Sequence, residues 1–117
     1  MDAIGVIVGV SWIFAGLLCA GLAIPLMRGK IGRNRFYGAR FPESFASDEA
    51  WFSINRYAGK RMLVASLPLA ATGVVSLFLP LTTHPNAAIL LGFAPLIFVL
   101  APAFATWRFA RRYGKSD

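Results

Sequence analysis

The sequence predicts an all-α fold: one integral membrane domain, residues 1–117, with three transmembrane helices and an ordered cytoplasmic loop between the first two. Hydrophobic residues make up 57% of the chain and charged residues 15%, against roughly 25% charged in a typical soluble domain. A soluble fold this small would leave much of its apolar surface in water. Three runs without Asp, Glu, Lys, Arg or His, at about 3–27, 62–81 and 87–107, each exceed the ~18 apolar residues expected of a spanning helix.

The first run is predicted to span the membrane rather than to be a cleaved signal peptide. No basic residue precedes it, and it is longer than the ~15 residues expected of a signal peptide's apolar core. Small residues line one face of this helix, so another helix backbone can approach closely. This packing face consists of Gly5, Gly9, Gly16, Ala20 and Ala23.

Two interpretations of the packing face remain open. It could dock another protein or a second copy, or it could pack against this chain's own second and third spans, and packing within the chain is favoured. The small residues of the second run that could receive it are Ala65, Ser66, Ala70, Gly73 and Ser76.

The segment between the first two runs, residues 28–61, is predicted to be ordered. Pro42 disfavours helical backbone at Phe41 and so favours an extended corner there. Ser47 is placed as the N-cap of a helix with an acidic first turn, where the helix dipole favours negative charge. We expect that helix to continue without interruption into the second span.

The side chains of this loop also leave two interpretations open. In the first, the loop locks onto itself, and Arg40 pairs with one of the loop's carboxylates through its planar guanidinium. In the second, Asn34, Arg40, Trp51 and Asn55 form a docking or ligand surface. No segment of the loop combines a nucleophile with a base or offers a phosphate-binding turn.

The third run is interrupted by prolines, which predict kinks in a membrane helix rather than its absence. The orientation follows from the twelve basic residues, all of which lie in the loop or the C-terminal tail. A three-span topology brings loop and tail to one side, which the positive-inside rule makes cytoplasmic, with the N-terminus outside. The basic residues are Arg28, Lys30, Arg33, Arg35, Arg40, Arg56, Lys60, Arg61, Arg108, Arg111, Arg112 and Lys115.

This placement also explains the net charge of +7 without a nucleic-acid partner, so the lipid bilayer is the expected partner and nucleic acid is not. Pumps and ion pathways usually need charged residues or histidine within the membrane, and the three runs contain no Asp, Glu, Lys, Arg or His. A lone cysteine, Cys19, and a lone histidine, His84, offer no metal set. We therefore expect no enzyme, no catalytic residue, no cofactor and no metal.

The loop resembles the signature of the SdpI family of membrane proteins. Type and spacing agree from Asn34 to Gly59 across the motif N-x-x-x-G-x-R-x-P-x-S followed by S-x-E-x-W-x-x-x-N-R-x-A-G. The matching residues are Asn34, Gly38, Arg40, Pro42, Ser44, Ser47, Glu49, Trp51, Asn55, Arg56, Ala58 and Gly59.

The resemblance implies a multi-pass protein of the bacterial plasma membrane. The family's namesake, a longer protein with further spans, gives immunity to a secreted membrane-active toxin and holds a transcriptional repressor at the membrane. The first functional hypothesis is therefore immunity or signalling by protein–protein contacts, with a toxin or membrane protein as partner and a regulator at the cytoplasmic loop. The alternative is an accessory subunit of a larger respiratory or envelope assembly. A small oligomeric transporter is disfavoured by the uncharged spans.

Overall fold

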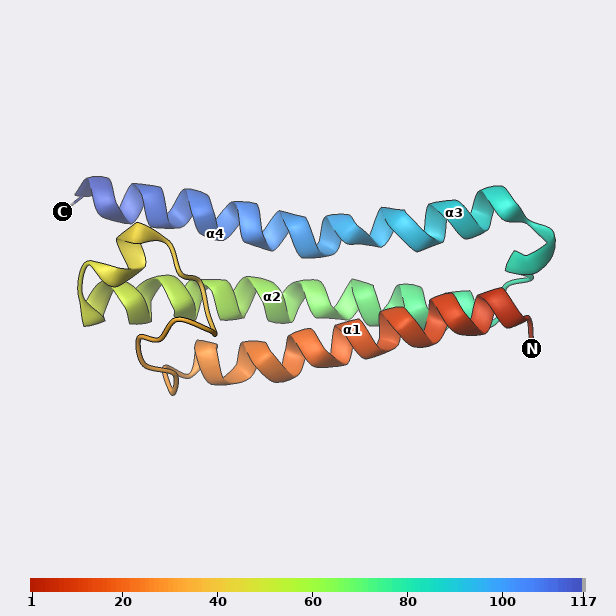
Figure 1. Ribbon diagram of the computed structural model, residues 1–117, viewed down its shortest axis with the longest axis horizontal. Coiled ribbons are helices and arrows are strands. Elements are labelled where there is room, and N and C mark those ends of the chain that lie inside the picture. Colours follow the sequence, from red (N-terminus) through yellow and green to blue (C-terminus); the bar gives the residue numbers. More distant parts are fainter. Residues whose placement is uncertain (117) are drawn as a thin grey trace.

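The computed structural model, which describes residues 1–116, is an elongated bundle of α-helices measuring 54 × 24 × 20 Å. Three helices are long and apolar enough to cross a membrane, and residues 1–116 contain no strand, which confirms the predicted fold class. They are α1 (Ala3–Met27), α2 (Asp48–Leu77) and a third, Pro85–Gly114, formed by α3 and α4. Figure 1 shows α2 between α1 and the α3–α4 rod, with the N-terminus at one end and the connecting loop and C-terminus at the other.

Helices α1 and α2 run antiparallel with their backbones in close contact through small residues. A Cβ atom added to Gly9 would lie 2.7 Å from the carbonyl oxygen of Gly73, and one added to Gly16 would lie 2.9 Å from the backbone nitrogen of Ala70. At the loop end, a Cβ on Gly59 would lie 2.7 Å from the carbonyl oxygen of Ala23. The structure thus places the packing face of α1 against α2 of the same chain.

Within that face the five residues are not equally buried. Gly5, Gly9, Gly16 and Ala23 are buried, while Ala20 is half-buried. Ala20 thus lies at the edge of the contact with α2, while the other four residues lie within it.

Helix α2 begins where the sequence predicts. The Ser47 side chain accepts a hydrogen bond from the Ala50 N–H at 3.0 Å, and Asp48 and Glu49 lie in the first turn. The helix ends at Leu77, although the apolar run continues to Leu81. Pro80 explains the difference, because it disfavours helical backbone at the residue before it and donates no N–H. The residues that follow form a short 3₁₀ turn, η2 (Leu81–Thr83).

The third spanning helix is interrupted, as its prolines predict. Helix α3 (Pro85–Phe93) passes through a 3₁₀ turn, η3 (Ala94–Leu96), into α4 (Ile97–Ser116). Pro95 has no N–H to donate to the carbonyl of Leu91, four residues earlier. The Trp12 indole Nε1–H donates to that carbonyl at 2.8 Å, so α1 satisfies a carbonyl that the proline leaves free.

Helix α4 attaches mainly to α2 and to the connecting loop. The rings of Tyr57 on α2 and Phe109 on α4 stack with centroids 4.2 Å apart and planes 4° apart. Near the opposite end, the Asp2 carboxylate accepts the N–H of Gly5 at 2.8 Å and the N–H of Thr82 at 3.0 Å. These contacts join the start of α1 to the η2 turn. They also lower the pKa of Asp2, the Gly5 hydrogen bond contributing most.

Candidate functional site

The connecting loop, residues 28–47, folds back over the helices instead of projecting from them (Figure 1). Asn34 shapes its first turn: the side-chain Oδ1 accepts the N–H groups of Phe36 at 2.9 Å and Tyr37 at 2.7 Å, and Nδ2 donates to the carbonyl of Gly32 at 2.9 Å. The Tyr37 hydroxyl donates to the carbonyl of Leu22 on α1. The loop is thus held beside the last turns of α1.

Asn55 holds the middle of the loop against α2. Its Oδ1 accepts the N–H of Ala39 at 2.6 Å, and its Nδ2 donates to the carbonyls of Ala39 at 3.3 Å and Trp51 at 3.0 Å. Asn55 is 1% exposed, and a buried amide left without partners would cost about 1–3 kcal/mol. The Asn55–Ala39 pair, which we call the loop clamp, therefore fixes the loop's register on α2.

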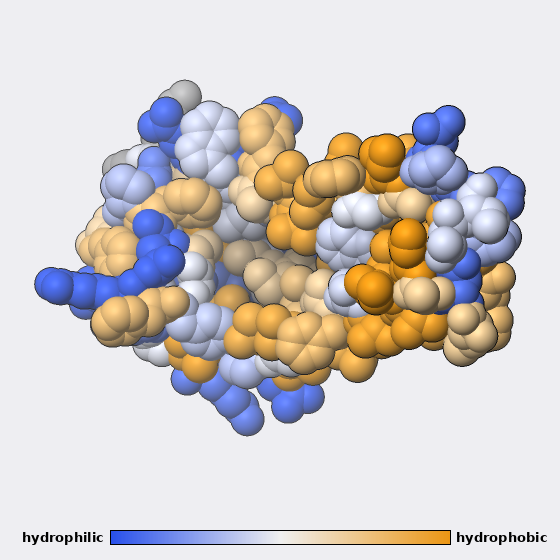
Figure 2. Space-filling model, turned by 45° about the vertical axis from the view of Figure 1, so that its right-hand side comes forward, coloured by the Kyte–Doolittle hydropathy of each residue, from blue (hydrophilic) through white to orange (hydrophobic). Residues whose placement is uncertain are grey.

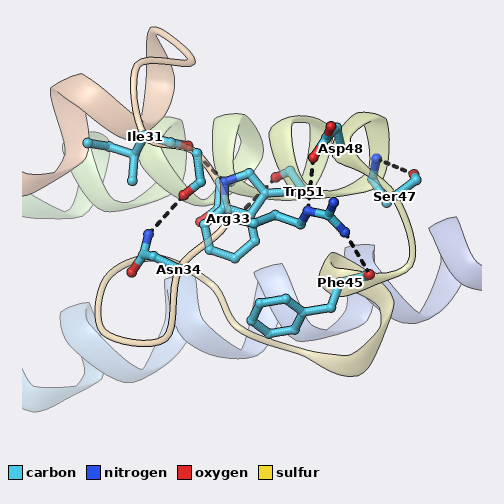
Figure 3. A network of polar contacts seen from close by, with 10 residues as sticks. Ile31, Arg33, Asn34, Phe45, Ser47, Asp48 and Trp51 are labelled. Carbon is cyan, nitrogen blue, oxygen red and sulfur yellow. Dashed lines mark hydrogen bonds and ion pairs between the residues drawn. The ribbon is translucent and has the colours of Figure 1, made fainter.

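Trp51 supports the loop clamp one helical turn away. It is fully buried, its ring centroid lies 5.4 Å from that of Phe45, and its Nε1–H donates to the carbonyl of Ile31 at 2.8 Å. Figure 3 shows this indole between the loop segment at Ile31 and the turn at Phe45. Trp51 and Asn55 lie one helical turn apart on α2, and the Asn55 side chain binds the Trp51 carbonyl.

Gly38 makes room for both of these side chains. Its φ of +114° lies in the region that favours glycine, and an added Cβ would lie 2.7 Å from Asn55 Oδ1 and 3.2 Å from the Trp51 ring. The glycine of the motif is therefore required by backbone conformation and by space.

Arginine pairing differs from the prediction. Arg40 was expected to bind a loop carboxylate, but its guanidinium donates to the carbonyl of Arg35, and Arg33 binds Asp48 with Nε and Oδ1 2.9 Å apart (Figure 3). Arg33 lies closer than Arg40 to the start of α2, because the turn shaped by Asn34 directs the loop back across the first turn of that helix. The Asp48 side chain is 74% exposed, so this pair contributes at most ~1 kcal/mol.

The second half of the loop links α2 to α4. Phe41 is extended (φ −83°, ψ 158°) as predicted, and Pro42 starts the 3₁₀ turn η1 (Pro42–Phe45). Glu43 lies 3.9 Å from the Arg111 guanidinium of α4. Ser44 is fully buried in this turn, and its hydroxyl makes no hydrogen bond within the described residues.

A cavity of about 710 Å³ lies beneath the loop, between α1 and α4, with α2 as its floor. Its volume falls within the ~300–1,000 Å³ of typical ligand sites. The lining is mostly apolar, and its charged members are Arg35 and Arg40. Figure 2 shows a hollow between the upper part of the molecule, α4 in Figure 1, and the lower part, α1.

The structure brings three of the sequence-predicted loop residues together at the loop clamp. Gly38, Trp51 and Asn55 are in mutual contact. Ser47 caps α2, and Gly59 contacts α1. The remaining members lie apart from the loop clamp or are exposed: Asn34, Arg40, Pro42 and Glu49.

Sequence reasoning missed Ala39, Tyr37 and Arg35. Ala39 takes part only through its backbone, which leaves no signal in the residue type. Tyr37 and Arg35 were visible as polar residues of the loop, but only the fold shows that they border a cavity. Lys115, predicted as part of the basic tail, lies outside the residues whose side chains are described. Within the described residues, no group of three or more His, Cys, Asp or Glu side chains could hold a metal ion.

A comparison with protein-family models finds a match over residues 30–103 to the model described as the SdpI/YfhL protein family. The matched region contains the loop clamp, all of α2 and the cavity's arginines. No curated protein and no solved structure matches the chain significantly.

Proposed function

Because the chain belongs to the SdpI/YfhL protein family, we propose that it is a non-enzymatic integral membrane protein that acts by binding other proteins. The proposed sites of contact are the spanning helices within the bilayer and the connecting loop on the cytoplasmic side. The proposed role is immunity to a membrane-active toxin, with relay of toxin presence to a cytoplasmic regulator. The resemblance of the loop to the family signature supports this role.

The observation that carries the proposal is the exposed apolar surface of the third spanning helix. Only 6% of its most apolar stretch is buried, against 17% for α1 and 22% for α2. Phe93, Leu100 and Phe104 are 67%, 64% and 57% exposed. Lipid tails cover such a surface without selectivity, whereas a partner helix gains specific van der Waals packing there.

The connecting loop adds a second surface with a fixed shape. The loop clamp holds its backbone, while Phe36 is 91% exposed and Arg33 and Glu49 are exposed at the same end of the bundle. A surface that is already ordered loses little conformational entropy when a partner binds. Aromatic and arginine side chains are also the types that contribute most to interfaces.

Photo-crosslinking in native membranes tests the proposal. A photoreactive amino acid at Leu100, 64% exposed on α4, is expected to yield a discrete crosslinked protein. The matched control is Leu69, which is 1% exposed on α2 and should yield none. The absence of any protein crosslink from Leu100, Phe93 and Phe104 would contradict the proposal.

The identity of the partner separates the two candidate functions. A small secreted toxin or a soluble regulator, together with increased toxin sensitivity when the protein is deleted, supports immunity and signalling. A stoichiometric large membrane enzyme supports the accessory-subunit alternative, which the exposed third helix favours equally. The packing face of α1 is already in contact with α2. Either kind of partner is therefore expected to bind α3 and α4.

A further inference from the structure

The cavity between α1 and α4 has the form of a lipid site. We propose that it holds one acyl chain of an anionic membrane phospholipid, and that Arg35 and Arg40 bind the lipid's phosphate. This proposal depends on neither a protein partner nor the orientation of the chain in the membrane. It requires only that the loop end of the bundle lie at a membrane surface.

The distribution of charge in the cavity points to an anionic amphiphile. The body is lined by apolar side chains from all three spanning helices, among them Leu22, Leu69 and Phe98. Within the described part of the chain, two charged side chains line the cavity, Arg35 and Arg40, and both belong to the connecting loop. A ligand with an apolar tail and an anionic head fits this separation, whereas a wholly apolar helix would leave the arginines unused.

The length of the cavity matches one leaflet. Along α2 the lining runs from Ala58 to Leu69, a rise of ~16 Å at ~1.5 Å per residue. This is about half of a ~30 Å hydrocarbon core. An acyl chain that enters at the loop end would therefore stop near the middle of the bilayer, where the chains of a leaflet end.

The arginines are held at the mouth of the cavity by the loop's own contacts. The Tyr37 hydroxyl binds the Leu22 carbonyl, and Arg40 binds the Arg35 carbonyl. These two contacts keep the loop segment from Arg35 to Arg40 at the edge of the apolar lining. Arginine guanidinium groups bind phosphate oxygens with paired, charge-assisted hydrogen bonds, and both side chains are exposed enough to reach a headgroup.

Lipid binding to the delipidated, full-length protein in mild detergent tests the proposal. Phosphatidylglycerol is expected to raise the thermal unfolding midpoint more than phosphatidylcholine with the same chains, and inorganic phosphate should have no effect. Arg35→Ala with Arg40→Ala should weaken phosphatidylglycerol binding at least ~30-fold. Lys30→Ala with Arg112→Ala removes the same charge outside the cavity and should leave binding unchanged.

A second pair of variants tests the acyl-chain site independently of charge. Ala103 lines the cavity and Ala101 does not, although both are exposed on α4. Ala103→Phe should abolish the stabilisation by phosphatidylglycerol, and Ala101→Phe should keep it. Equal effects of the two lipids, or equal losses in a variant and its matched control, would overturn the proposal. An effect of inorganic phosphate alone would show a simple anion site instead.

Discussion

At the scale of single residues, the loop is ordered by side chains that bind backbone groups. Asn55 satisfies both backbone groups of Ala39, and Trp51 satisfies the carbonyl of Ile31. Because the partners are backbone atoms, the loop sequence can vary around them while the hydrogen bonds remain. Any change in the shape of the backbone near Ala39, by contrast, acts directly on the loop clamp.

Gly38→Ala is therefore expected to destabilise the protein by about 1–3 kcal/mol, because it strains the backbone at φ +114° and drives a methyl group into Asn55. The rate of trypsin cleavage after Arg40 in mild detergent should rise with the loss of the loop clamp. Gly32→Ala is the control, since a Cβ there meets nothing within 4 Å and φ is not positive. Equal cleavage of the two variants would disprove this account of the loop.

Asp2 is expected to give a stability that depends on pH in acid. Because hydrogen bonds lower its folded pKa below the ordinary 3.8, the stabilisation is complete above that value and is lost as pH falls through the folded pKa. The thermal unfolding midpoint of the wild type should exceed that of Asp2→Asn at pH 6, and the gap should close as the pH falls well below the ordinary pKa of 3.8. A gap that stays constant with pH would show that the carboxylate charge is not involved.

Residue-scale prediction from sequence succeeded where a side chain has one local role. The Ser47 N-cap and the extended Phe41 before Pro42 were predicted and are confirmed, because both follow from neighbours in the chain. The pairing of Arg40 was predicted wrongly, since the turn at Asn34 brings Arg33 rather than Arg40 to the helix start. The path of the loop over α2 also depends on contacts between residues far apart in the chain, such as Trp51 with Ile31, and spacing does not reveal these contacts.

At the scale of elements, α1 and α2 form one tightly packed pair. Gly9 and Gly73 face each other, and a Cβ on either would lie within 2.7 Å of the other's carbonyl oxygen. The third helix, by contrast, is interrupted at Pro95 and packs against α2 mainly near the loop end. The kinks were predictable from its prolines, but the cavity was not, because it depends on how far apart α1 and α4 lie.

Gly9→Ala should destabilise the helix pair by about 1–3 kcal/mol, since the added methyl overlaps the α2 backbone. Gly21→Ala is the matched control on the same helix: nothing lies within 4 Å of its Cβ, so the better helix propensity of alanine should leave stability unchanged or slightly higher. Reversible unfolding in mixed micelles measures both. Equal stability of the variants would argue against close packing at Gly9.

At the scale of the whole molecule, charge is separated between the two ends. All twelve lysines and arginines lie in the connecting loop, the first turns of α2 or the C-terminal part of the chain from Arg108 on, whereas the end with the N-terminus and the η2 turn carries none. The protein therefore carries its basic side chains at only one of the two membrane surfaces. The positive-inside rule then predicts that the loop faces the cytoplasm and the η2 turn faces outward.

Thiol labelling in intact cells checks this orientation. In a Cys19→Ala background, which removes the only cysteine, Thr83→Cys should react with a membrane-impermeant reagent and Glu49→Cys should react only after permeabilisation. Both positions are exposed at opposite ends of the bundle. The reverse pattern would show an inverted insertion.

The unequal packing of the three helices has a consequence for the order in which they associate during synthesis and membrane insertion. The two helices with the closest contact, α1 and α2, precede the third helix in the chain, and the connecting loop joins them. They can associate as a helical hairpin in the bilayer while the third helix is still being made. The third helix then docks onto the formed hairpin, and because α4 lines one side of the cavity, this docking step also builds the candidate lipid site.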